Sequence, residues 1–167
     1  MEKHRLLHRT LSFVLALTVI FSLVALPTPA LAAAPEQTAH VIVNQVYGGS
    51  DDGYCSHSFI ELYNPADTPV DMTGWSVQYR SSADNTAQNT AWQKLDLTGW
   101  IGAEGYYLIR CGAITVTTNK KYDIPEGNQE WDIQMHNKGL SVALVNRQTL
   151  LDAAVQGDIS GNSTIID

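Results

Sequence analysis

The chain has 167 residues, of which 17 are acidic and 10 are Lys or Arg, and its formal net charge at pH 7 is -7. Affinity for nucleic acid rests largely on Lys and Arg that neutralise phosphates, so this balance argues against a nucleic-acid partner. Once an N-terminal targeting segment is set aside, the length fits a single domain that can bury one core.

Residues 1–32 are expected to be a cleaved signal peptide. A basic start is followed by an uncharged apolar run from Leu11 to Leu26 and by the small residues Ala30 and Ala32. The run is shorter than the roughly 20 residues of a membrane-spanning helix, so cleavage is favoured over an anchor and over a buried helix. Cleavage removes three basic residues and one acidic residue and brings the net charge to about -9. The mature protein is expected to be secreted or at the cell surface, without a membrane span. The basic start consists of Lys3, Arg5 and Arg9.

Residues 33–39 are interpreted as a linker, and residues 40–167 as one all-β domain. Short alternating segments at roughly regular spacing, with almost no helical periodicity, predict a β-sandwich. The run Ser163–Asp167 begins like a further strand, so the chain either ends in a short edge strand or is a fragment of a longer modular protein. The predicted strands are His40–Tyr47, Ser58–Tyr63, Trp75–Arg80, Trp92–Leu97, Gly105–Arg110 and Gly139–Asn146.

Three segments between these strands are expected to be irregular. Gly48–Gly53 is rich in Gly and Asp, which favour turns, and it lacks the following helix and the Lys that a phosphate-binding loop needs. Ser81–Thr90 is a polar loop that we expect to be exposed. Ala113–Trp131 is interrupted by Pro125 and Gly127.

No group of residues in the sequence has the spacing of a catalytic or metal site. Glu61 lies in mid-strand, but nothing nominates the second carboxylate that glycoside hydrolysis requires, so a structural role is favoured. Asp51-Asp52-Gly53 lacks the register of a calcium loop, which leaves only weak surface calcium binding open. The isolated histidines His40, His57 and His136 do not form a zinc motif. No enzyme activity, cofactor or metal is therefore expected.

Cys55 and Cys111 are the two cysteines of the chain. In an exported protein a disulfide is the leading interpretation, and it would constrain the unfolded chain by about 4 kcal/mol in the entropy model. Two unpaired thiols in different loops are the alternative.

Aromatic residues are the remaining candidates for binding. They could form a platform that stacks on sugars, or most of them could belong to the core, where Trp75 is expected. The candidates are Trp75, Trp92, Trp100, Trp131, Tyr54, Tyr106, Tyr107 and Tyr122.

The chain resembles bacterial lamin tail domains. The matching segments are VIVNQVYGGS, SHSFIELYNPADTPVDMTGWSVQY, LDLTGWIGAEGYYLIR and EWDIQMHNKGLSVALVN, which together cover nearly all of residues 41–146. The resemblance implies an immunoglobulin-like β-sandwich without catalytic residues of its own, used as an interaction surface or as an accessory module of exported proteins. The cysteine pair is not required by the family pattern. The expected core residues are Phe59, Leu62, Trp75, Val77, Tyr107, Val142 and Leu144.

Three functions remain open at this point. The first is an extracellular adhesion or targeting module that binds an unknown protein or cell-surface ligand. The second is a carbohydrate-binding module, and the third is an accessory domain of an exported nuclease or phosphatase encoded beyond Asp167. Fold alone does not choose among them.

Overall fold

The computed structural model describes residues 40–49, 53–81, 91–114, 122–155 and 162–167. All of these residues belong to one compact unit, Thr38–Asp167. Their regular secondary structure consists of strands, and none of them forms a helix that could cross a membrane. The expected signal peptide and linker at 1–39 lie outside the described residues.

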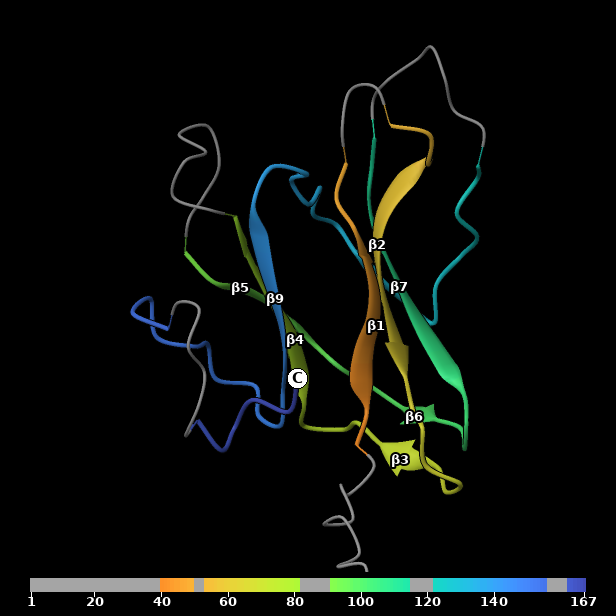
Figure 1. Cartoon of the computed structure of the whole chain (residues 1–167), viewed down its shortest axis with the longest axis vertical. Coiled ribbons are helices and arrows are strands. Elements are labelled where there is room, and N and C mark those ends of the chain that lie inside the picture. Colours follow the sequence, from red (N-terminus) through yellow and green to blue (C-terminus); the bar gives the residue numbers. More distant parts are fainter. Residues whose placement is uncertain (1–39, 50–52, 82–90, 115–121, 156–161) are drawn as a thin grey trace, which may run out of the picture. The chain divides into compact units, whose positions relative to one another are not determined.

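The described residues form nine strands in three sheets (Figure 1). A four-stranded sheet has the order β1-β2-β7-β8, a three-stranded sheet has the order β5-β4-β9, and β3 pairs with β6 in a short ribbon. All pairs are antiparallel except β7 and β8, which run parallel. The strands are β1 (Ile42–Tyr47), β2 (His57–Tyr63), β3 (Val70–Asp71), β4 (Ser76–Ser81), β5 (Gln93–Asp96), β6 (Trp100–Ile101), β7 (Tyr106–Ala113), β8 (Gln129–Trp131) and β9 (Leu140–Val145).

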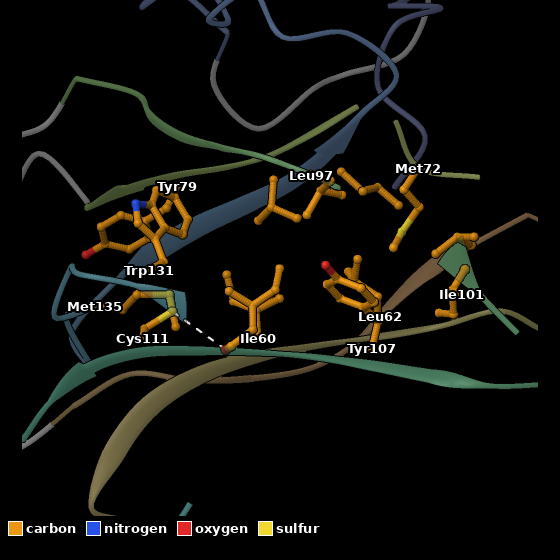
Figure 2. Close-up of a cluster of buried hydrophobic side chains, with 14 residues drawn as sticks. Ile60, Leu62, Met72, Tyr79, Leu97, Ile101, Tyr107, Cys111, Trp131 and Met135 are labelled. Carbon is orange, nitrogen blue, oxygen red and sulfur yellow. Dashed lines mark hydrogen bonds between the residues drawn. The ribbon is translucent and has the colours of Figure 1, made fainter. Parts of the chain in front are cut away.

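The core lies between the two larger sheets (Figure 2). Alternate side chains of β2 and β7 point into it, because successive residues of a strand face opposite sides of the sheet. Ile60 and Leu62 are fully buried there and meet Val77 and Leu144 from the opposite sheet. This arrangement is the all-β sandwich that the alternation of the sequence predicted.

The outer face of β4 is also buried, although its residues are polar. Ser76, Gln78 and Arg80 are covered by the chain that follows β9 and bind its backbone. Ser76 Oγ donates to the carbonyl of Arg147 at 2.6 Å, and Gln78 Nε2 donates to the carbonyl of Thr149 at 2.9 Å. The central strand of this sheet is therefore enclosed on both sides.

The last described residues run beside β9. Ile165 forms an antiparallel bridge with Val145, and the N–H of Ile166 donates to the carbonyl of Leu144 at 2.7 Å. Asp167 Oδ2 accepts a hydrogen bond of 2.8 Å from the N–H of Val43 in β1. The short edge strand, which was one of the two interpretations of residues 163–167, is present only as a single bridge.

Five of the six predicted strands match an observed one to within about two residues at both ends, and the sixth, Gly105–Arg110, ends three residues before β7 does. The short strands β3, β6 and β8 were not predicted, and β8 lies inside the segment 113–131 that was expected to be irregular. Two or three residues are too few for an alternation to be recognised.

The predicted core is correct for Leu62, Val77, Tyr107 and Leu144, all of which are buried. Trp75 and Val142 are only partly buried, at the margin of the core cluster. Phe59 is wrong. It lies on the outer face of β2, where its ring stacks on Tyr47 with a centroid distance of 5.7 Å, because it has the opposite strand parity to Leu62.

Candidate functional site

The expected disulfide is absent, since Cys55 and Cys111 are both free. The strand register explains why. Cys111 lies inside β7 near Ser58, whose hydroxyl donates to the carbonyl of Gly112. Cys55 precedes β2 and forms an isolated backbone β-bridge with Tyr122. Three residues along an extended chain span about 10 Å, which is beyond the roughly 7 Å between Cα atoms that a disulfide allows. The alternative of two unpaired thiols is the one observed.

Cys111 is not a nucleophile in this structure. Its side chain is buried in the core and its thiol donates a weak hydrogen bond to the carbonyl of Ile109 at 3.8 Å. Burial raises the pKa of Cys111 from its ordinary 9.0 to about 12, and the charge of Glu130 adds to the effect. The thiol is therefore protonated at neutral pH, whereas nucleophilic cysteines need a lowered pKa.

The candidate carboxylate and the histidines make local contacts. Glu61 Oε1 accepts a hydrogen bond of 2.6 Å from Asn44 Nδ2, which ties β2 to β1 across the irregularity in their pairing. His57 Nδ1 lies 2.9 Å from Ser56 Oγ, and His136 Nδ1 accepts a bond from the N–H of Lys138. No group of three His, Cys, Asp or Glu residues that could hold a metal ion exists among the described residues.

A cavity of roughly 260 Å³ opens at the β7–β8 edge. Glu130, one of its two acidic residues, accepts a hydrogen bond of 2.9 Å from Arg110 Nε and another of 2.9 Å from the N–H of Gly127. Partial burial works to raise the pKa of Glu130, but these bonds together lower it, so the group is a fixed carboxylate rather than a proton donor. The cavity is lined by His57, Cys111, Gly112, Ala113, Glu130, Trp131 and Asp132.

A second cavity, of roughly 160 Å³, lies on the outer side of β9. Its wall includes Trp92, whose ring also lies 5.6 Å from the guanidinium of Arg80. The indole Nε1 of Trp92 is buried and has no hydrogen-bond partner among the residues that the structure describes. The cavity lies between segments that border residues outside the described ranges, 82–90 and 156–161.

The four tryptophans have three different environments. Trp92 and Trp131 are buried and Trp75 is half-buried. Trp100 stands apart, because 64% of its surface is exposed. The interpretation of most aromatics as core is thus correct for Trp92, Trp131 and Tyr107, while Tyr54, Trp100, Tyr106 and Tyr122 are exposed.

The exposed Trp100 belongs to the β3–β6 ribbon, which lies near the C-terminal end of β2 and the start of β7 (Figure 1). Trp100 and Asp71 are direct cross-strand partners, and both are exposed. The neighbouring pair in the ribbon, Val70 and Ile101, packs against the core. Directly opposed residues share a face of an antiparallel pair, so the side chains of Asp71 and Trp100 leave the ribbon from neighbouring positions on its outer face.

Two turns next to the ribbon are tied together by hydrogen bonds. Asn64 is fully buried, and its side-chain amide donates to the carbonyls of Thr68 and Gly102 at 2.8 and 2.9 Å. The N–H of Glu104 donates to the carbonyl of Ala66 at 2.9 Å. We refer to residues 63–73 and 98–106 as the turn end of the domain.

The turn end is acidic and aromatic. It carries the carboxylates of Asp67, Asp71 and Glu104, and residues 53–75 and 95–109 contain no Lys or Arg. Tyr63 and Tyr106 are cross-strand partners whose ring centroids are 4.7 Å apart, and Tyr106 is 59% exposed. Exposed aromatic rings and exposed carboxylates therefore occur together at the turn end, in segments without Lys or Arg.

Trp100 and Tyr106 were among the candidate aromatic residues of the sequence. Asp71 was not identified as a residue of the same surface. A sequence signal for Asp71 was the order Asp71-Met72-Thr73, which allows the Asp side chain to accept a hydrogen bond from the N–H two residues later. The two segments that were expected to be irregular loops, Gly48–Gly53 and Ser81–Thr90, fall largely outside the described residues.

Comparison with known proteins identifies one family. The model of the Lamin Tail Domain matches residues 34–158 of the chain, a range that includes all nine strands. No curated protein matches the chain significantly.

Proposed function

The chain belongs to the lamin tail domain family, immunoglobulin-like domains that are generally involved in protein interaction, and we propose that it is a non-catalytic interaction module of an exported protein. In this role the sandwich is a scaffold, and an exposed surface of it holds a protein or another ligand outside the cell. Adhesion and targeting are both uses of such a module.

The observation that carries this proposal is the exposure of Trp100. A large aromatic side chain left 64% exposed next to a closed core contributes nothing to folding that a smaller residue would not. Trp and Tyr are the residues most often found as energetic hot spots of protein interfaces, because each supplies a large contact area from a side chain with few rotamers. Tyr106, at the same end, is exposed to a similar degree.

The chemistry of the titratable groups supports a binding role over a catalytic one. Cys111 has a pKa of about 12, Glu61 is hydrogen-bonded to Asn44, and Glu130 is paired with Arg110. A general acid or base needs a pKa near the working pH and reach to a substrate. These three groups instead have structural partners.

Export is supported by the N-terminal sequence alone. Its basic start, apolar run and small residues before residue 33 have the order of a signal peptide. The acidic composition fits a protein that avoids nucleic acid.

A second candidate function is carbohydrate binding. The exposed ring of Trp100 favours it, because exposed aromatic faces can stack on sugars. The buried Trp92 and Trp131 do not contribute to such a platform.

The test begins with the full chain expressed with its own N-terminal segment in a secreting bacterial host. The mass of the exported product should correspond to cleavage near Ala32. The purified product is then labelled and applied to cells of the producing host, with and without protease treatment of the cell surface. Binding that is lost after protease treatment supports a protein ligand, and binding that resists protease but is competed by oligosaccharides supports the second candidate. Hydrolysis of phosphoester or glycoside substrates at an enzymatic rate, or the absence of binding to treated and untreated cells alike, would overturn the proposal.

A further inference from the structure

Building on the proposed function, we propose that the outer face of the β3–β6 ribbon, formed by Trp100 and Asp71, binds an Arg or Lys side chain in a basic, extended peptide segment of the partner. The cation would lie over the indole and next to the carboxylate. The inference names both the place on the domain and the chemistry of the partner.

The register of the ribbon provides the geometry. Asp71 and Trp100 are opposite each other on two antiparallel strands, so their Cβ atoms are about 4.5–5.5 Å apart. The inward pair of the ribbon, Val70 and Ile101, is anchored in the core, and Ile101 is only 1% exposed. The outward pair is therefore presented on a backbone that packing holds in place.

Asp71 is held in its charged form and in one orientation. Its Oδ1 accepts a hydrogen bond of 2.9 Å from the N–H of Thr73. The side chain of Thr73 and then its N–H lower the pKa of Asp71. A carboxylate has about four acceptor positions, so these bonds leave capacity for a cationic donor.

The surrounding charge selects the sign of the partner. Asp67 and Glu104 belong to the same turn end, and the two segments that form it contain no Lys or Arg. A cation that approaches Trp100 therefore comes to two segments that carry three carboxylates and no Lys or Arg. An anionic partner would be repelled, and a neutral sugar would gain no attraction from this net charge.

A cation next to an indole and a carboxylate gains two attractions at once. Cation–π attraction is strongest for Trp among the aromatic residues, and the planar guanidinium of Arg can stack on a ring while it donates to a carboxylate. The exposed ring pair Tyr63–Tyr106 at the same end offers further faces for a second basic residue of the segment. An Arg-rich segment should accordingly bind better than a Lys-rich one.

The experiment measures binding of the exported protein to four probes by isothermal titration calorimetry and by the indole signals in NMR spectra. The probes are hexaarginine, hexalysine, hexaglutamate and the neutral sugar cellohexaose. We expect binding in the order hexaarginine, hexalysine, then no binding for hexaglutamate, and the binding should weaken as salt is raised because ion pairs are screened. The Trp100 indole should shift in the NMR titration.

Four variants locate the site. Trp100→Ala should weaken hexaarginine binding by about tenfold, and Asp71→Asn, which keeps the acceptor for Thr73 and removes the charge, by about three- to fivefold. Asp152→Asn is the matched carboxylate control, because Asp152 accepts a bond from the N–H of Ala154 in the same local geometry. Tyr122→Ala is the aromatic control, since Tyr122 is 63% exposed and lies outside the turn end. Both controls should bind as the unchanged protein does.

Several results would overturn the inference. They are hexaarginine binding no stronger than hexaglutamate binding, equal loss in the control variants, or binding of cellohexaose that requires Trp100. If Trp100→Ala and Asp71→Asn leave binding to the host cell surface intact, the site is wrong while the interaction module stands. If cell-surface binding is absent from the start, the proposed function itself fails.

Discussion

Gln78 and Leu151 are joined by a hydrogen bond of 2.8 Å between the side-chain Oε1 of the first and the backbone N–H of the second. Gln78 also donates from Nε2 to the carbonyl of Thr149 and to Ser76 Oγ. It is fully buried in the middle of β4. Its side-chain amide supplies the hydrogen bonds that water would otherwise make to the backbone of the segment that covers this sheet.

We therefore expect Gln78→Ala to destabilise the protein by about 2–4 kcal/mol, because the buried N–H of Leu151 would be left unpaired and the hydrogen bonds to Thr149 and Ser76 would be lost. Urea unfolding followed by tryptophan fluorescence measures the change. Gln45→Ala, on the exposed part of β1, is the control and should change stability by no more than about 0.5 kcal/mol. Similar losses in the two variants would show that the covering segment is not held by this side chain.

The same strand shows how far sequence reasoning reaches. The alternation from Trp75 to Arg80 is sufficient to predict a strand with an apolar and a polar face. It does not reveal that the polar face is buried, because the covering segment begins some seventy residues later and is held through its backbone atoms. Backbone partners leave no trace in composition or periodicity.

The two faces of β2 give a second test. Leu62→Ala should cost about 2–5 kcal/mol, since Leu62 is fully buried in the core. Phe59→Ala should cost about 1 kcal/mol, because only a half-exposed ring and its stacking on Tyr47 are lost. Chemical denaturation of both variants measures the difference, and a larger loss for Phe59→Ala would contradict the observed orientation of the strand.

The cysteines should react as two thiols of unequal accessibility. Alkylation of the denatured protein without reductant should add two adducts to the intact mass. In the folded protein Cys55 should be alkylated well before Cys111, because at pH 8 a thiol with a pKa near 12 is ionised in only about one molecule in ten thousand. A protein that takes up adducts only after reduction would instead contain the disulfide.

The raised pKa of Cys111 also predicts a dependence of stability on alkaline pH. A thiol whose pKa is higher in the folded than in the unfolded protein stabilises the fold fully below the unfolded value of about 9.0, and this contribution is lost as pH rises toward 12. At pH 10 the loss is about 1.4 kcal/mol. Tyr79 and Tyr107, whose pKa values burial raises above 10.0, add to the loss at higher pH.

Cys111→Ala removes the thiol contribution and leaves the two tyrosines. Its free energy of unfolding should therefore fall less between pH 7.5 and pH 10 than that of the unchanged protein, by about 1.4 kcal/mol. Urea titrations of both proteins at the two pH values measure the difference. The same pH dependence in both would mean that Cys111 is not buried as a neutral thiol.

The candidate site could be predicted from the sequence only in part. Trp100 and Tyr106 could be named as aromatic candidates, but the separation of exposed from buried rings depends on which strand face meets the core. For Trp100 that face is set by the two-residue pairing of β6 with β3, which is too short to be recognised from alternation. The cross-strand pairing of Trp100 with Asp71 joins residues nearly thirty positions apart, so it requires the fold.

Gly127 tests the parallel pairing of β8 with β7, the least predictable part of the fold. A Cβ at this position would lie 2.7 Å from the carbonyl oxygens of Leu108 and Gln129 and 2.8 Å from the nitrogen of Arg110. All three are backbone atoms, so Gly127→Ala must displace β8 from β7, and we expect a loss of about 2 kcal/mol or more. Gly102→Ala is the matched control, because a Cβ there would meet nothing within 4 Å. Thermal unfolding should show a lower midpoint for Gly127→Ala alone. If Gly127→Ala is as stable as Gly102→Ala, the chain does not approach β7 at this point and the parallel pairing is incorrect.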